Sequence, residues 1–210
     1  DYKDALGRDD RDVWILATEI EMGALNKLGV FEHDLTREEV KQRGCTVRPV
    51  PLILCYTAKW DLDTGAFIKA KARLCLQGIP AFMQRGKHFF QTRASTPDPA
   101  TCRFLSAVLV GRKMHRIIFD IKNAYPTTNC EEYEKIPCLY PKGMQDLHMR
   151  GDTMLICFLI KVLYGNPSAG RRFAKARDKW ATTFFNNNGW QCVRCRSDPC
   201  LMKMISPTCH

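Results

Sequence analysis

Two apolar stretches on either side of a turn decide the fold of this chain: Val-Arg-Pro-Val-Pro-Leu-Ile-Leu-Cys-Tyr at residues 47–56 and Ala-Phe-Ile-Lys-Ala-Lys-Ala-Arg-Leu-Cys-Leu at residues 66–76. Between them, Asp-Leu-Asp-Thr-Gly at residues 61–65 has the composition of a turn. Apart from the prolines, both stretches are rich in residues that favour strands. We therefore predict a basic β-hairpin in this part of the chain.

Helical periodicity appears on both sides of the hairpin. Apolar residues recur at helical spacing from residue 12 to residue 28, where Gly29 provides a stop. A second helix is expected to begin at Asp98-Pro99, because aspartate caps free amides and proline is tolerated in the first turn. It should end near Val110. A third helix is predicted over residues 171–185, with aromatic and basic sides.

The remaining segments complete an α+β pattern. Ile117, Phe119 and Ile121 alternate with other residues, which is the period of a strand and places Asp120 on the face opposite the phenylalanine. Residues 154–161 and 190–204 are also predicted as strand-like. Residues 129–150 contain charge and proline and are interpreted as a loop.

Charge and composition restrict the classes of function. The 210 residues carry a formal net charge of +10, which fits a polyanionic partner better than a small neutral metabolite. No window reaches 18 consecutive apolar residues, so a membrane-spanning helix is not expected. The 11 cysteines and the charged opening from Asp1 to Asp12 favour a reduced compartment over secretion.

Asp120 is the first candidate for chemistry, because it follows a predicted strand and precedes a bend that ends in Tyr125. Mg²⁺ prefers carboxylates together with substrate phosphates, so one aspartate becomes a metal ligand only if other ligands converge on it. The alternative is an aspartate that caps a turn or pairs with a neighbouring lysine.

Three blocks of the sequence resemble the reverse transcriptase of copia-type (Ty/copia, pseudovirid) retrotransposons. They are Lys-Ala-Lys-Ala-Arg-Leu at residues 69–74, Asp-Ile-Lys-Asn-Ala-Tyr at residues 120–125, and Leu-Tyr-Gly at residues 163–165 with Arg171 closely behind. The resemblance covers nearly the whole chain. It implies the fingers and part of the palm of a right-hand polymerase, an α+β fold with an antiparallel sheet and packed helices. Residues 47–100 would be fingers-like and residues 101–210 palm-like.

The resemblance also implies roles for individual residues. Asp120 would be the first metal-binding carboxylate of a two-metal site for Mg²⁺, and the backbone carbonyl of Ile121 would face the nucleotide-bound metal. Tyr125 would lie under the sugar as a steric gate. The remaining nucleotide-binding positions implied by the family are Lys71 and Arg73, which would hold the triphosphate, and Asn123 and Ser168.

The implied function is RNA-directed DNA synthesis by a segment of a retrotransposon Pol polyprotein. The partners would be an RNA template, a DNA primer and dNTPs, with integrase and ribonuclease H regions in the parent chain. Synthesis would take place in a cytoplasmic virus-like particle or in the nucleus. No membrane partner is expected.

The sequence departs from the family in one decisive respect. The family completes its metal site with a Tyr-x-Asp-Asp hairpin, whereas the one Asp-Asp pair here is Asp9-Asp10, ahead of all three blocks. We therefore interpret the chain as a fragment that ends before the hairpin, and we expect it to be inactive as a polymerase by itself. The alternative is a basic, non-catalytic nucleic-acid-binding remnant.

A zinc site is a second alternative. Cys192, Cys195 and Cys200, with Cys209-His210, roughly imitate the spacing of zinc ligands. Only one Cys-x2-Cys pair is present, so buried or idle thiols are the favoured interpretation.

Overall fold

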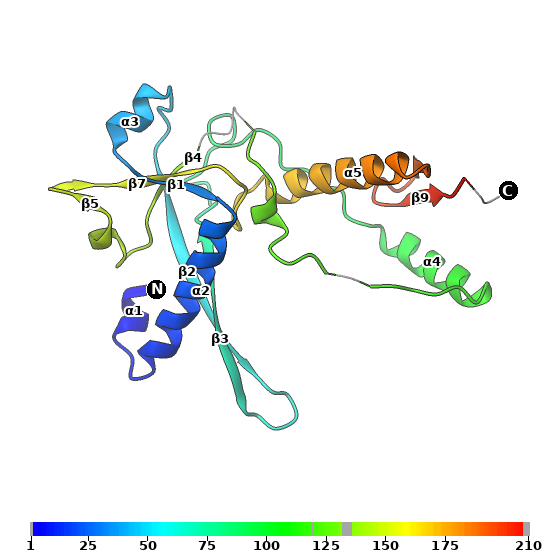
Figure 1. Ribbon diagram of the computed structural model, residues 1–210, viewed down its shortest axis with the longest axis horizontal. Helices are drawn as coiled ribbons and strands as arrows, with labels where there is room; N and C mark the ends of the chain where they lie inside the picture. Colours follow the sequence, from blue (N-terminus) through cyan, green and yellow to red (C-terminus); the bar gives the residue numbers. More distant parts are fainter. Residues whose placement is uncertain (1, 119, 132–135, 208–210) are drawn as a thin grey trace. The chain divides into compact units, whose positions relative to one another are not determined.

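The computed structural model describes residues 2–118, 120–131 and 136–207. The chain divides into two compact units: residues 1–92 with 125–169 form unit 1, and residues 93–124 with 170–210 form unit 2. Helices and strands occur in both (Figure 1), which confirms the predicted α+β class. The fingers-like and palm-like regions stay a prediction.

A five-stranded mixed sheet forms the centre of unit 1. Its strand order is β1 (Phe31–Leu35), β7 (Ile156–Leu159), β4 (Ile136–Leu139), β2 (Val50–Trp60) and β3 (Phe67–Leu76). Three of the pairings are antiparallel, but β2 and β4 run parallel. The prediction of an antiparallel sheet is therefore wrong for this pair. A parallel pairing needs a long crossover connection, and the chain between β2 and β4 is long enough to provide one.

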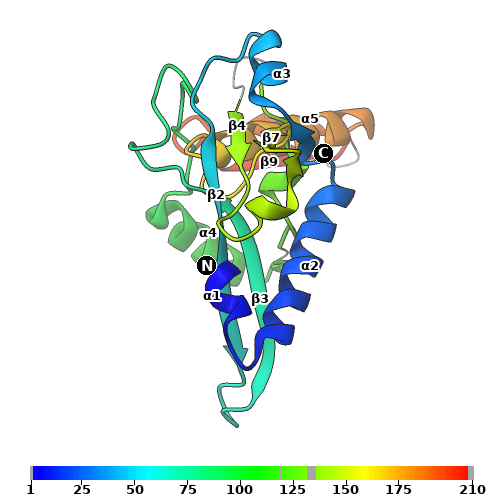
Figure 2. The same cartoon turned by 90° about the vertical axis from the view of Figure 1, so that its left-hand side faces the viewer.

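The predicted hairpin is confirmed as β2 and β3, which pair from Leu52 opposite Leu76 to Trp60 opposite Phe67. Alternate residues of both strands face the core, where Leu74 and Leu76 are almost completely buried. Helix α2 (Arg11–Lys27) runs alongside the hairpin (Figure 2) and contributes Leu25 to the same core. Each fully buried leucine stabilises the fold by about 1.5–3 kcal/mol.

The face that α2 buries differs from the one that the apolar spacing indicated. Ala17 and Leu25 are buried, whereas Ile20 remains 65% exposed. Thr18 is buried as well, because its hydroxyl bonds to the carbonyl of Trp14 and lies 2.9 Å from the hydroxyl of Tyr56 on β2. The orientation of this helix therefore combines apolar packing of Ala17 and Leu25 with a polar contact to the hairpin.

Several segments of unit 1 have structure that was not predicted from the sequence. Strand β4 lies in the predicted loop, and β1 was not anticipated. Helix α3 (Arg37–Gln42) begins with a capping box, in which Thr36 and Glu39 bond to each other's backbone N–H groups. The shorter elements of this unit are α1 (Tyr2–Leu6), η1 (Tyr125–Thr127), η2 (Gln145–Leu147), β5 (Met149–Arg150) and β6 (Thr153–Met154).

Unit 2 contains the two other predicted helices. Helix α4 (Pro99–Gly111) begins where expected, with the Asp98 side chain accepting from the Ala100 N–H group. Helix α5 (Ala169–Asn187) is followed by an antiparallel hairpin of β8 (Gln191–Arg194) and β9 (Met202–Ile205). The Asp198 carboxylate accepts from the Asp98 N–H group at 3.0 Å and so joins this end of the chain to the start of α4. Among the described helices, none is long and apolar enough to cross a membrane.

The predicted strand over residues 117–122 is wrong for the residues that the structure describes there. Ile117, Ile118, Asp120 and Ile121 have no regular secondary structure, and a turn begins at Lys122. Ile117 is 86% exposed and Ile118 is 77% exposed. A strand needs a partner for its backbone groups, and the described part of unit 2 does not supply one here. Phe119 lies outside the described residues.

Two glycines allow the turn after Leu163 to approach the end of β3. Gly165 has a φ of +80°, and a Cβ atom at this position would collide with the carbonyl oxygen of Leu76. A Cβ atom at Gly78 would collide in turn with the carbonyl oxygen of Gly165. Both positions therefore require glycine. Gly165 requires it for its backbone conformation and for space, and Gly78 requires it for space alone.

We predict opposite effects for two Gly→Ala substitutions in unit 1. Gly165→Ala should lower the free energy of unfolding by more than about 2 kcal/mol, because the methyl group meets backbone that has no room to move. Gly23→Ala, in the middle of α2 with open space around it, should raise the free energy of unfolding by about 0.5–1 kcal/mol. Urea unfolding followed by circular dichroism measures both. A Gly165→Ala variant as stable as the parent would contradict the close approach.

Candidate phosphate-binding site

The outer face of the β2–β3 hairpin carries four basic side chains. Lys59 lies directly opposite Lys69, Lys71 lies opposite Thr57, and Arg73 lies opposite Cys55. Because successive side chains of a strand point to opposite faces, these residues share the face turned away from the core. Lys59, Lys69 and Arg73 are exposed and Lys71 is half-buried. We call this set, Lys59, Lys69, Lys71 and Arg73, the basic face.

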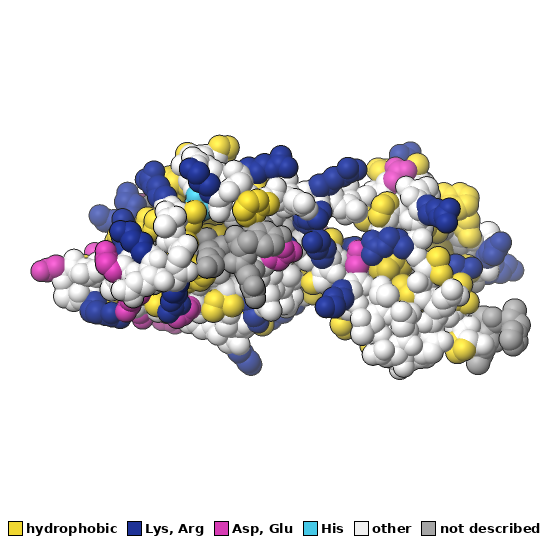
Figure 3. Space-filling view, turned by 90° about the horizontal axis from the view of Figure 1, so that it is seen from above, with side chains coloured by type: hydrophobic (Ala, Val, Ile, Leu, Met, Phe, Trp, Pro, Cys, Tyr) yellow, Lys and Arg dark blue, Asp and Glu magenta, His cyan; other side chains and the backbone are white. Residues whose placement is uncertain are grey.

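The basic face is electrostatically unfavourable when nothing is bound to it. Like charges directly opposite each other destabilise a strand pair, and Lys59 and Lys69 are such a pair. Burial and the positive charges of Arg73 and Lys59 hold the pKa of Lys71 below its usual value. A bound polyanion would relieve this repulsion. Lys and Arg are also more widespread than Asp and Glu on the surface seen in Figure 3.

Glu21 of α2 balances part of this charge. Its Oε1 atom accepts a hydrogen bond of 3.2 Å from the Leu74 N–H group, at the edge of β3. Burial raises the pKa of Glu21, while the Leu74 hydrogen bond and the charges of Lys71 and Arg73 act against this rise. The carboxylate therefore anchors α2 to β3 and provides the negative charge nearest to the basic face on that helix.

The ring of Tyr164 contacts the guanidinium of Arg73. Its Cζ atom lies 5.7 Å from the ring centroid of Tyr164, within the range of a cation–π interaction. Tyr164 is fixed to β3 because its carbonyl accepts from the Leu76 N–H group at 2.8 Å. The ring of Tyr125 lies 5.6 Å from that of Tyr164. Arg73, Tyr164 and Tyr125 therefore form one cluster, although they are far apart in the sequence.

The structure unites some of the residues predicted for the site and separates others. Lys71, Arg73 and Tyr125 belong to the same part of unit 1. Ser168 is completely buried, with its hydroxyl and N–H groups both bonded to Asn166 Oδ1 at 2.9 Å. Its side chain therefore supports the turn before α5.

Asp120, Ile121 and Asn123 belong to unit 2. Asn123 has a φ of +54°, a conformation that asparagine adopts more readily than most residues. The side chain of Asp120 is exposed. In the part of the chain that the structure describes, no three His, Cys, Asp or Glu side chains are placed to hold a metal ion. One exposed carboxylate does not fit a site for two Mg²⁺ ions.

The cysteines of the zinc alternative have other neighbours. The thiol of Cys192 donates to the sulfur of Met202 at 3.8 Å, and the sulfur of Cys195 lies 3.1 Å from the Ser197 hydroxyl oxygen. Cys209 and His210 lie outside the described residues. Nothing in the described region brings a zinc-ligand set together.

The sequence analysis missed Glu21. It lies four residues from both Ala17 and Leu25, which are buried, so it occupies the inner side of α2. A charged residue at helical spacing between two core positions is a signal of a buried polar contact. Tyr164 belongs to the block at residues 163–165 that resembles the family. Its contact with Arg73 depends on the path of a turn, which the sequence does not reveal.

Comparisons of the chain with protein-family models, with curated proteins and with solved structures found no match. The function is therefore argued from the residues and their arrangement.

We predict that Glu21→Gln strengthens anion binding at the basic face. Glutamine keeps an oxygen for the Leu74 hydrogen bond and removes the negative charge, so the affinity for inorganic triphosphate should rise about threefold to tenfold. The gain should shrink between about 0.1 M and about 1 M salt, since the Debye length falls from about 10 Å to about 3 Å. Isothermal titration calorimetry measures both effects.

Glu38→Gln is the matched control, because it removes the same charge from exposed α3. Equal gains from both substitutions would show that net charge alone governs binding and that the basic face is not the site.

Proposed function

We propose that this chain is a segment of an RNA-directed DNA polymerase of the copia-type retroelement class, and that the basic face binds the triphosphate of a nucleotide. The observation that carries the proposal is the junction of two of the three sequence blocks. The block at residues 69–74 and the block at residues 163–165 meet through the Arg73–Tyr164 contact, and the Leu76–Tyr164 hydrogen bond joins them two residues beyond the first block. A chance resemblance gives no reason for distant blocks to meet.

The chemistry of the cluster suits a nucleotide. A planar guanidinium can bind two phosphate oxygens at once, and the Tyr164 ring limits the orientations open to Arg73. Lys71, two residues away on the same face, adds a second positive charge. Tyr125 would lie beside the sugar and act as the steric gate that the resemblance implies. The exposed ends of Lys59 and Lys69 would face phosphates of the template.

The polymerase reaction itself needs more than the described residues provide. Asp120 is the one candidate carboxylate ligand that the resemblance implies, and together with the Ile121 carbonyl it does not fit the Mg²⁺ pair without a second carboxylate-bearing segment. We therefore derive no catalytic step from this structure. The exposed Ile117 and Ile118 beside Asp120 support the proposal, because an added hairpin would cover this apolar surface and give the segment a partner.

The proposal extends to partners and place of action. An RNA template, a DNA primer and dNTPs would be the ligands, within a larger Pol polyprotein that also carries integrase and ribonuclease H. A cytoplasmic virus-like particle or the nucleus would be the compartment. The positive net charge of the chain is in keeping with such ligands.

Nucleotide binding tests the role of Arg73. We expect Arg73→Ala to weaken binding of dTTP by about tenfold to hundredfold, the usual effect of losing charged hydrogen bonds. Arg73→Lys should recover only part of the affinity, because lysine keeps the charge and loses the planar fork. Arg37→Ala, on exposed α3, is the control and should bind dTTP as the parent does. Calorimetry gives the dissociation constants, and equal values for all variants would refute the proposed site.

Primer extension on poly(rA)/oligo(dT) tests the wider proposal. We expect no extension by the 210 residues alone and metal-dependent extension by a version continued through the residues that follow His210 in the gene. Asp120→Asn should abolish extension by the longer version. If the longer version is inactive but binds RNA in a salt-sensitive manner, the chain is the non-catalytic binding module.

A further inference from the structure

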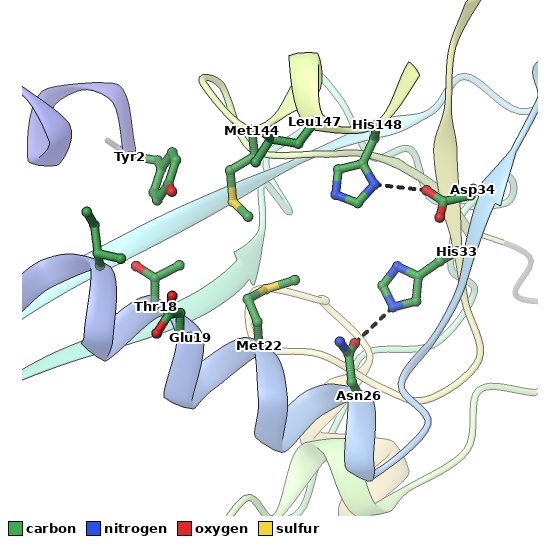
Figure 4. A pocket seen from close by; sticks show the side chains of 11 residues that line it. Tyr2, Thr18, Glu19, Met22, Asn26, His33, Asp34, Met144, Leu147 and His148 are labelled. Atoms are coloured by element: carbon green, nitrogen blue, oxygen red, sulfur yellow. Dashed lines mark hydrogen bonds and ion pairs between the residues drawn. The ribbon is translucent and has the colours of Figure 1, made fainter. Parts of the chain in front are cut away.

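A pocket of about 510 Å³ lies in unit 1, away from the basic face. Its walls come from α1, α2, β1 and the segment around η2, so all of them belong to one compact unit. Figure 4 shows the side chains of Tyr2, Met22 and Met144 facing the space between α2 and η2. The volume is in the range of small-molecule sites, which are concave, mostly apolar and edged by a few polar groups.

Polar side chains gather at one end of the pocket. His148 Nδ1 bonds to Asp34 Oδ1 at 2.8 Å, and His33 Nε2 bonds to Asn26 Oδ1 at 2.9 Å (Figure 4). Behind them, the ring of Tyr140 stacks on the ring of His148 with 3.5 Å between centroids. The Tyr140 hydroxyl donates to Asp34 Oδ1 at 3.2 Å. This network fixes the polar end before any ligand arrives, which lowers the entropy cost of binding.

The charge of the pocket is negative. The hydrogen bond from His148 and the contact with Tyr140 hold the pKa of Asp34 below its usual value, so this carboxylate is ionised at neutral pH. Burial lowers the pKa of His33, which is therefore neutral under the same conditions. Glu19 contributes a second carboxylate at the opposite end of the pocket, next to Thr18 (Figure 4). On a chain with a net charge of +10, this local charge disfavours phosphates and favours cations.

The rest of the wall is apolar and aromatic. Tyr2 and Met22 line it from α1 and α2, and Met144, 8% exposed, lines it from the opposite side. Methionine side chains adapt to the shape of an apolar ligand, and an aromatic ring attracts a cation through its face. A pocket with a polar end and an apolar wall suits a ligand that has one charged end and one apolar end.

We propose that this pocket binds a small organic cation, with its ammonium group beside Asp34 and its apolar body against Met22, Met144 and Tyr2. Nothing in the proposed polymerase function requires such a ligand. The site is independent of Lys71, Arg73 and Asp120. It would remain if the nucleotide-binding proposal failed.

A charge series of three ligands of similar size tests the proposal. The probes are phenethylamine, which is a cation at neutral pH, the neutral 2-phenylethanol and the anionic 3-phenylpropionate. Each is titrated into the full chain and followed by NMR chemical shifts. We expect phenethylamine to bind at least about fivefold more tightly than the neutral alcohol, and the anion not to bind, as Coulomb interactions with partly exposed carboxylates imply.

Three variants locate the binding. Asp34→Asn should weaken phenethylamine binding by about fivefold, whereas Glu19→Gln, which removes the same charge from the opposite end of the pocket, should change it by less than about twofold. Asparagine tolerates the left-handed conformation of residue 34, where φ is +59°, and Glu19 is exposed on α2, so both variants should keep the fold. Met22→Trp fills the apolar part and should abolish binding of every probe. Circular dichroism verifies the fold of each variant.

Each other outcome would overturn the proposal. Equal affinity for the three probes would show an apolar cavity without charge selection. Tighter binding of the anion would show that the histidines dominate the site. Unchanged binding in the folded Asp34→Asn protein, or equal losses in the Asp34→Asn and Glu19→Gln proteins, would contradict the place of the ammonium group. No binding of any probe would show that the pocket takes no ligand of this class.

Discussion

The hydrogen bond from the Leu76 N–H group to the Tyr164 carbonyl fixes the geometry on which the rest of unit 1 depends. It joins the end of the long hairpin to a turn almost 90 residues later in the chain, and it forms because Gly78 and Gly165 leave room for backbone against backbone. From this junction the chain leads back to the buried Leu163 and forward to the buried Ser168. The same junction holds the Tyr164 ring under Arg73.

Helix α2 serves two sites of opposite charge. Glu21 reaches the edge of β3 beside the basic face, and Glu19 lines the acidic pocket. Two residues along a helix correspond to a rotation of about 200°. The side chains of Glu19 and Glu21 therefore point in nearly opposite directions. The helix therefore has the proposed phosphate-binding face on one side and the proposed cation-binding pocket on the other, and the Thr18–Tyr56 contact is one of those that hold it in this orientation.

The elements that were predicted correctly are those whose formation depends mainly on residues close together in the sequence. The hairpin, α2, α4 with its Asp98 cap and α5 were all found from periodicity, turns and caps. The capping box at Thr36 and Glu39 is a signal of the same local kind, and helix α3 could have been predicted from it. Strand β4 was not predicted because proline, here Pro137, is unusual inside a sheet. Strand β1 was not predicted because apolar and polar residues do not alternate along it. In both strands the pairing partner, not the local sequence, decides the structure.

The site shows the same division. Lys71 and Arg73 could be placed on the hairpin because the sequence specifies that hairpin, whereas their nucleotide-binding role comes from the resemblance and stays a prediction. Glu21 and the contact of Tyr164 with Arg73 depend on segments that meet only after folding. The strand predicted around Asp120 is wrong because a strand also needs a partner that the local sequence does not show. Its alternating pattern describes what the segment can do beside a partner, and the described residues provide none.

The chain crosses between its two compact units three times, at residues 92–93, 124–125 and 169–170. Neither unit is therefore a continuous stretch of sequence. A protein cut after Thr92 would keep β1, β2 and β3 but lose β4 and β7, the strands that lie between β1 and the hairpin. A gene fragment that encodes one unit would have to splice distant segments together. Neither unit can therefore be exchanged as one continuous module, because each is built from two separate stretches of sequence.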